Sequence, residues 1–239
     1  MRMNQIKVEL QSTFGTDRDV ANAAWTSSYE HQKKKQRTDE DVKRVINLLA
    51  DQKHSVPFEG IIFRFWIKMS IATDRQFMTH RLQSASGMSG RYRTMPNEYL
   101  DLPEDVENIL DKFKIEAGLS TNPTTINAFQ EYYKLCESAN NMYSIVSRAA
   151  KEAEKNQIIS NSEYKRLREF YRGVLPQHNM TERVTVINLR SFANFIKLRL
   201  SEHAQPEIRE VARQMLEQVK QNQDIKYAIE ALERNNWVI

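Results

Sequence analysis

The sequence predicts one mixed α+β domain that spans residues 1–239. Only six glycines and six prolines occur among 239 residues, which is too few for a turn-rich all-β fold. One segment, residues 60–69, alternates between apolar and polar side chains as a strand does. From residue 103 onward the pattern is mostly helical, so we expect a largely helical second half.

The first predicted helix covers residues 39–53. Val42, Ile46 and Leu49 recur there at helical spacing and should form its buried face. The polar run before this helix includes Lys33–Lys35. Such a run is either a solvated loop or a basic flap over an anionic ligand, and the sequence leaves both interpretations open.

The strand at 60–69 should turn one apolar face, from Ile61 to Met69, toward the core. Residues 71–83 then change to a helical pattern, and the small polar residues 84–91 predict a loop. Spacings of four and three residues would place Gln76, His80 and Gln83 on one helix face.

Further helices are predicted in the second half of the chain. Asn122-Pro123 resembles a helix start, in which proline takes the first helical position. The remaining helices are expected at about 162–172, at 189–200, from Pro206 onward and at about 222–234.

Charge and cysteine content exclude several classes of protein. The formal net charge of +4 permits an anionic ligand but does not require one. The single cysteine, Cys136, excludes an internal disulfide and a cysteine-based metal cage. The glycines form no nucleotide-binding loop, and the five histidines lack ligand spacing, so we expect no metal. Without a signal peptide or a long apolar run, we expect a cytoplasmic protein with no membrane partner.

Two polar clusters are candidates for a site. The first lies between Arg75 and Arg91 and contains arginines, hydroxyl groups and a glycine whose backbone N–H is accessible. These groups suit a phosphate, although serines that cap a helix end would give the same sequence pattern. The second cluster joins Arg172 and Arg199 with Arg190 and Asn194, which lie four apart on one helix face. With Asn188, which belongs to the same cluster, these side chains suit a planar heteroaromatic ligand; the alternative interpretation is a set of surface arginines and a helix-capping Asn188.

The segment 79–91 resembles the signature of the flavin-dependent thymidylate synthases (ThyX), which is RHR-x2-S-x-N-x2-S-x-R. Five of its seven specified positions match, and the stretch reads Thr79-His80-Arg81-x2-Ser84-x-Ser86-x2-Ser89-x-Arg91. The likeness continues in His54-x-x-Pro57-Phe58-Glu59, Arg75-Gln76, Arg172-x-Val174-Leu175-Pro176, Asn188-x-Arg190-Ser191, Asn194-Phe195-x-x-Leu198-Arg199 and His203-Ala204-Gln205. Order and spacing together make this pattern far more specific than any single motif.

The resemblance implies a central, mostly antiparallel sheet flanked by helices, with 100–165 as a variable helical region. It implies transfer of the methylene of methylene-tetrahydrofolate to C5 of dUMP and reduction to the methyl group of dTMP. FAD would be the cofactor and NADPH the reductant. The resemblance also implies a homotetramer whose active sites form between subunits, and no nucleic-acid partner.

Site residues follow from the matching positions. Arg199 matches the catalytic arginine at the pyrimidine edge, where a fixed cation stabilises negative charge on the ring. Positions that hold dUMP match Arg75, Gln76, Gly87, Met88, Ser89, Gly90, Arg91 and Arg172. Positions that contact the flavin match Ser27, His54, Thr79, His80, Arg81, Asn188, Arg190 and Asn194.

This chain departs from the family pattern near the expected flavin. The departures are Thr79 for arginine, Ser86 for asparagine, Gly87 for glutamate, Val56 for a small hydroxyl residue, Gly60 for histidine and Pro206 for tryptophan. With a remodelled pocket, water could intercept the transferred carbon and give a 5-hydroxymethyl nucleotide from dUMP or dCMP. A non-catalytic nucleic-acid binder that uses Lys33–Lys35 is a further alternative from another class.

Overall fold

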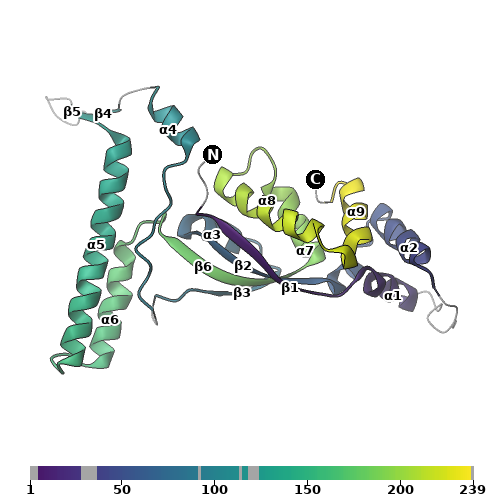
Figure 1. The fold of residues 1–239 in the computed structure, drawn as a ribbon, viewed down its shortest axis with the longest axis horizontal. Helices are drawn as coiled ribbons and strands as arrows, with labels where there is room; N and C mark the ends of the chain where they lie inside the picture. The colour runs from purple at the N-terminus through teal and green to yellow at the C-terminus, as the bar shows by residue number, and fades with distance from the viewer. Residues whose placement is uncertain (1–4, 28–36, 91–92, 113–114, 118–123, 238–239) are drawn as a thin grey trace. The chain divides into compact units, whose positions relative to one another are not determined.

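The computed structural model describes residues 5–27, 37–90, 93–112, 115–117 and 124–237 (Figure 1). The chain clusters into two compact units. The first comprises Met1–Gln5, Met69–Asp74 and Met88–Thr181, and the second comprises Ile6–Lys68, Arg75–Gly87 and Glu182–Ile239. The single-domain expectation stays a prediction.

A four-stranded sheet organises the second unit. Its strands are β1 (Lys7–Phe14), β2 (Ile62–Ser70), β6 (Met180–Asn188) and β3 (Gln83–Gly87), hydrogen-bonded in the order β1-β2-β6-β3. The pairs β1–β2 and β3–β6 are antiparallel. The α+β fold class is thereby confirmed.

The predicted alternation along β2 is confirmed. Phe63, Phe65 and Ile67 are fully buried, whereas Arg64 between them is exposed. The ring of Phe192, on helix α7 (Leu189–Arg199), lies 5.1 Å from that of Phe63. Because this helix packs directly on the buried face of β2, the sheet core holds α7 in place.

Helix α8 (Pro206–Lys220) begins at Pro206, as predicted, and protects the sheet edge. Gln214 accepts a hydrogen bond from the backbone N of Val8 at 3.0 Å and donates to the carbonyl of Ile6 at 3.0 Å. Gln218 forms the same kind of pair with β1, accepting from Leu10 N at 2.7 Å. These amides satisfy backbone groups that an edge strand would otherwise expose.

Three further helices belong to the second unit, which also contains the 3₁₀ turn η2 (Val56–Gly60). They are α1 (Asp17–Ser27), α2 (Asp39–Asp51) and α9 (Lys226–Arg234), the last preceded by a 3₁₀ turn, η4 (Gln223–Ile225). Helix α2 matches the predicted helix: Val42, Ile46 and Leu49 are buried, and Thr38 closes a capping box with Asp41. Asp17 accepts from the backbone N of Tyr227 at 2.7 Å and thereby fixes the start of α9.

The prediction of a helix over 71–83 and a loop over 84–91 was wrong. Helix α3 (Ile71–Met78) is shorter, and β3 follows it. The Gln83 amide donates to the carbonyls of Phe77 and His80, at 3.0 and 2.9 Å, which satisfies the helix end. His80 and Gln83 therefore do not share a helix face with Gln76.

The expectation of a largely helical second half is confirmed, but the sequence pattern gave no sign of strand β6. Its buried face carries Thr181, Arg183, Thr185 and Ile187. The guanidinium of Arg183 lies over the ring of Phe77, 5.3 Å from the centroid. Because polar residues point inward here, hydrophobic periodicity could not reveal this strand.

The first unit is mainly helical. Helices α5 (Ala128–Lys155) and α6 (Asn161–Tyr171) stand side by side, and the 3₁₀ turn η3 (Arg172–Val174) follows α6 (Figure 1). The predicted helix at 162–172 is thus confirmed. The unit also contains α4 (Glu104–Leu110), β4 (Ile115–Ala117) and β5 (Thr124–Ile126).

The predicted start of the long helix at Asn122-Pro123 was wrong. That dipeptide lies outside the described residues, and α5 is instead capped by Asn127, whose side chain accepts from Gln130 N at 3.2 Å. In the part of the chain that the structure describes, no helix has the length and apolar character needed to cross a bilayer.

Candidate functional site

Helix α7 provides the side chains around which the site is organised. Asn188 caps it, its oxygen accepting a hydrogen bond from the backbone N of Ser191 at 2.8 Å. Arg190 and Asn194 follow on one exposed helix face, as their four-residue spacing predicts. Arg199 is the last residue of the helix and is partly buried.

The largest group of predicted residues surrounds one cavity, which we call the His80 pocket. Its volume is about 580 Å³, within the range of small-molecule sites. The six predicted residues that line it are Thr79, His80, Arg81, Arg190, Asn194 and Arg199. They come from the segment directly after α3 and from α7, so the fold brings together residues more than one hundred positions apart.

The imidazole of His80 and the guanidinium of Arg199 are in direct contact. Arg199 Nε donates a hydrogen bond to His80 Nε2 at 2.9 Å, and its Nη2 donates to Thr79 Oγ1 at 3.3 Å. Burial lowers the pKa of His80, and the nearby charge of Arg199 lowers it further. The imidazole is therefore neutral at pH 7 and accepts the bond with Nε2, which leaves its ring proton on Nδ1.

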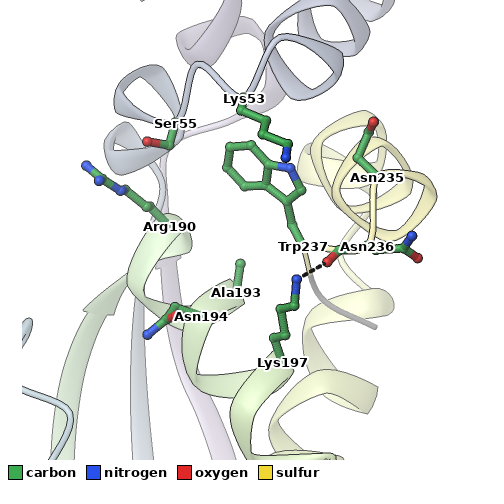
Figure 2. Close-up of a pocket in the computed structure, with 9 residues that line it drawn as sticks. All are labelled: Lys53, Ser55, Arg190, Ala193, Asn194, Lys197, Asn235, Asn236 and Trp237. Carbon is green, nitrogen blue, oxygen red and sulfur yellow. Dashed lines mark hydrogen bonds between the residues drawn. The ribbon is translucent and has the colours of Figure 1, made fainter.

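A second cavity, which we call the Trp237 pocket, lies on the other flank of Arg190 and Asn194. It has a volume of about 490 Å³ (Figure 2). Figure 2 shows the indole of Trp237 pointing from the C-terminal turn toward the loop of Lys53 and Ser55. Glu59 pairs with Arg190 at 2.6 Å, and both side chains are well exposed, so this ion pair is weak.

His54 lies in a third cavity, of about 610 Å³. Val56 and Gly60, two of the departures from the family pattern, also line it. Lys53 and Ser55 are common to this cavity and the Trp237 pocket. These two departures therefore lie together in space, in a cavity that Arg199 does not line.

The other predicted residues of the second unit lie near α3 and β3. Gln76 donates a hydrogen bond from its amide to Gln205, just before α8. Arg75 is exposed on α3, and Gly87 ends β3. An added Cβ on Gly87 would lie 3.8 Å from the carbonyl of Glu182, an ordinary contact, so packing alone does not require glycine there.

In the first unit, the chain after β3 lies beside Arg172. A Cβ added to Gly90 would lie 3.2 Å from Cδ of Arg172, which is shorter than an ordinary van der Waals contact. Met88 packs on a small cluster of Met95, Tyr143 and Leu175. The structure therefore places one predicted substrate residue, Gly90, beside another, Arg172, and Met88 and Ser89 directly precede Gly90 in the chain.

Two groups of predicted residues lie where the structure gives no side-chain positions. Arg91 and Lys33–Lys35 are outside the described residues. Ser27 is the last residue of α1, and its side chain is not described. Among the described residues, no three His, Cys, Asp or Glu side chains converge as metal ligands would.

Sequence reasoning missed part of this site. Lys53, Lys197 and Trp237 line the Trp237 pocket, yet none is a specified position of a matched motif. The dipeptide Asn235-Asn236 could have indicated a helix end directly before Trp237, because asparagine often ends helices in the left-handed conformation.

Comparison with known proteins identifies the family of this chain. The sequence model of the Thy1 family, described as thymidylate synthase complementing protein, matches residues 9–223. The chain belongs to the Thy1 family. Flavin-dependent thymidylate synthases of Kosmotoga olearia and Thermus thermophilus are 34% and 30% identical to it, over 181 and 227 residues. These matches cover 73% and 92% of this chain, and 70% and 74% of the relatives.

The fold of this Thy1 member is also found in a solved structure. A UMP/dUMP methylase, PolB from Streptomyces cacaoi bound with 5-Br dUMP, superposes with a TM-score of 0.69. The alignment covers 98% of this chain and 97% of that one at 24% identity. The sequence matches confirm the family resemblance inferred from the motifs, and the structural match shows that the fold is shared over 98% of this chain.

Proposed function

We propose that this chain is a flavin-dependent thymidylate synthase. It would transfer the methylene carbon of methylene-tetrahydrofolate to C5 of dUMP and add two electrons, giving dTMP and tetrahydrofolate. The observation that carries this proposal is the His80 pocket, where Arg199 is held by His80 and Thr79 in a cavity that Arg190 and Asn194 also line. The names of the relatives favour a methyl product over the 5-hydroxymethyl alternative.

The residues of the His80 pocket suit a flavin. Leu82, Ile187 and Leu198 supply apolar surface for a planar ring, and Arg190 and Asn194 supply donors for its polar edge. Ser191 Oγ is buried and has no hydrogen-bond partner among the described residues. The flavin ring has one apolar and one polar edge. The pocket suits it because it combines apolar walls with hydrogen-bond donors and an unsatisfied hydroxyl. Bound FAD would supply the two electrons for the reduction, and NADPH would restore them.

Arg199 is proposed as the catalytic residue. A carboxylate beside it would neutralise its charge, but no carboxylate pairs with Arg199 within the described ranges. The neutral His80 orients the guanidinium without cancelling its charge. A cation fixed in this way stabilises negative charge on the pyrimidine, which eases loss of the N3 proton and makes C5 more nucleophilic.

The remaining predicted residues would hold the nucleotide and the cofactor. In the first unit, the side chain of Arg172 packs against the buried backbone at Gly90, and we propose that its guanidinium binds the phosphate of dUMP. Flavin contacts are proposed for His54, Arg81 and Asn188. The proposal also includes a homotetramer in the cytoplasm; light scattering of the purified protein would test the tetramer.

The test is a reaction with defined products. Purified protein would be titrated with FAD, followed by its visible spectrum, and then incubated with dUMP, methylene-tetrahydrofolate and NADPH. Mass analysis should show dTMP and tetrahydrofolate. A 5-hydroxymethyl nucleotide without dTMP would replace the proposed product, and a protein that takes up no flavin would refute the proposal.

A further inference from the structure

We propose that the Trp237 pocket is a subsite for an adenosine phosphate and that Trp237 is its stacking platform. This inference rests on the proposed function, because FAD and NADPH both carry an adenosine phosphate. Trp237 lies beyond residues 9–223, the part matched by the Thy1 family model. The residue is therefore a feature of this chain that its family membership does not assign.

Two helix ends hold the indole in position. Helix α9 ends in a left-handed residue, Asn236, with φ 56°, and the backbone N of Trp237 donates to the carbonyl of Leu232 at 2.9 Å. Asp51 accepts from the Asn235 amide at 2.9 Å and from Arg234 at 2.8 Å. These bonds tie the C-terminal turn to the end of α2 and position the backbone of Trp237, and the indole packs against the ring of Phe58 with 5.9 Å between centroids.

The charge of the pocket favours an anion. Lys53, Arg190 and Lys197 line it, and no lining residue in the described part of the chain is acidic, although Glu59 beside the pocket balances part of the charge of Arg190 at 2.6 Å. Lys197 Nζ donates to the carbonyl of Asn236 at 2.9 Å, so part of its role is to cap α9. Lys53 is exposed, and its backbone is in the left-handed conformation, with φ 58°. An aromatic face beside several cations is suited to a base that carries a phosphate.

The position of the pocket indicates which ligand would reach it. Arg190 and Asn194 line both the Trp237 pocket and the His80 pocket. A dinucleotide with its redox ring beside His80 would cross these two side chains and place its adenosine end beside Trp237. Arg190 would then lie near the connecting phosphates, where a guanidinium binds best. The volume of about 490 Å³ is within the range of sites that enclose such a group.

The test compares ligands that have or lack the adenosine phosphate. FAD and FMN affinities would be measured for wild type, Trp237→Ala and Trp237→Phe, with Trp66→Phe as the control. Trp66 lies on β2, where its indole donates to Glu182 at 3.2 Å. Loss of base stacking should weaken FAD binding by roughly 5- to 100-fold in Trp237→Ala and leave FMN binding unchanged. Trp237→Phe should keep most of the affinity, because its ring still stacks and still packs on Phe58.

A second arm identifies the source of the adenosine. If it belongs to the reductant, Trp237→Ala should raise the KM for NADPH and leave the ratio of FAD to FMN affinity unchanged. Quenching of tryptophan fluorescence by 5′-AMP gives a readout without turnover, and it should vanish in Trp237→Phe but persist in Trp66→Phe. Unchanged FAD, NADPH and 5′-AMP responses in Trp237→Ala would overturn this inference while leaving the proposed function intact. A protein that binds 5′-AMP at Trp237 but no flavin would instead refute the proposed function.

Discussion

The contact between His80 and Arg199 allows a quantitative prediction. Replacing His80 with alanine removes the acceptor of the 2.9 Å bond from Arg199 Nε. A hydrogen bond to a charged group contributes roughly 1.5–3 kcal/mol, and the partial exposure of this site favours the lower end. Without that acceptor, the guanidinium keeps only its bond to Thr79 among the described residues and can rotate away from the pyrimidine. We expect kcat to fall about 10- to 100-fold in His80→Ala.

The pH dependence of turnover provides the sharper test. Because the pKa of His80 is lowered below its usual 6.5, protonation begins only at acidic pH. The imidazolium cannot accept a bond from Arg199 and repels it, so kcat should fall as the pH drops through that lowered pKa. The contribution of His80 to stability is full above pH 6.5 and is lost over the same acidic interval. His80→Gln keeps an acceptor that does not titrate, so it should retain most turnover and should not show the fall in kcat at acidic pH, which we call the acidic limb of the pH profile.

The assay is steady-state dTMP formation at saturating FAD, with circular dichroism to verify the fold. The matched control is His203→Gln, because His203 is exposed and does not line the His80 pocket. This control should keep both the wild-type kcat and the acidic limb. Equal kcat values for wild type and His80→Ala at neutral pH would refute the orienting role. An acidic limb that persists in His80→Gln would show that a different group titrates.

Three other predictions follow from single contacts. Arg199→Ala should lower kcat by roughly 100- to 1000-fold without unfolding the protein, since it removes the fixed positive charge at the pyrimidine ring. Turnover near the wild-type rate would exclude the catalytic role of Arg199. Gly90→Ala places a Cβ 3.2 Å from Arg172 Cδ, so it should displace that side chain and raise the Kd for dUMP several-fold in a calorimetric titration. An unchanged Kd would show that Arg172 does not bind the phosphate. Burial raises the pKa of Asp17 from 3.8 to about 6, so its stabilising contribution is full below pH 3.8 and is lost as the pH rises through 6. Urea unfolding at several pH values should show this decline in wild type and not in Asp17→Asn.

Several elements could be predicted from the sequence because their stability is local. The repeats of Val42, Ile46 and Leu49 in α2, and the alternation along β2, each follow from one apolar face. The same holds for α7, where the spacing of Arg190 and Asn194 by itself implied a shared face. Motif order further identified the family and most residues of the His80 pocket.

Strands β3 and β6 could not be predicted, because their partners are distant in the sequence. Ser84 pairs with Val186 and Ser86 with Val184, about one hundred residues apart. Such pairs are stabilised by backbone hydrogen bonds, which leave no apolar pattern in a serine-rich segment. The same pairing ends α3 early and brings His80 to Arg199.

The sequence alone determined the family and the faces of several helices, since each depends on residue spacing along one segment, and it predicted which residues would contact ligands. Only the tertiary structure decided which of these side chains meet. Arg199 reaches His80 because α7 packs on β2, and Trp237 shares a pocket with Arg190 because Asp51 anchors the end of α9. Those contacts depend on how separate elements pack, and packing at this range is not encoded in any local repeat.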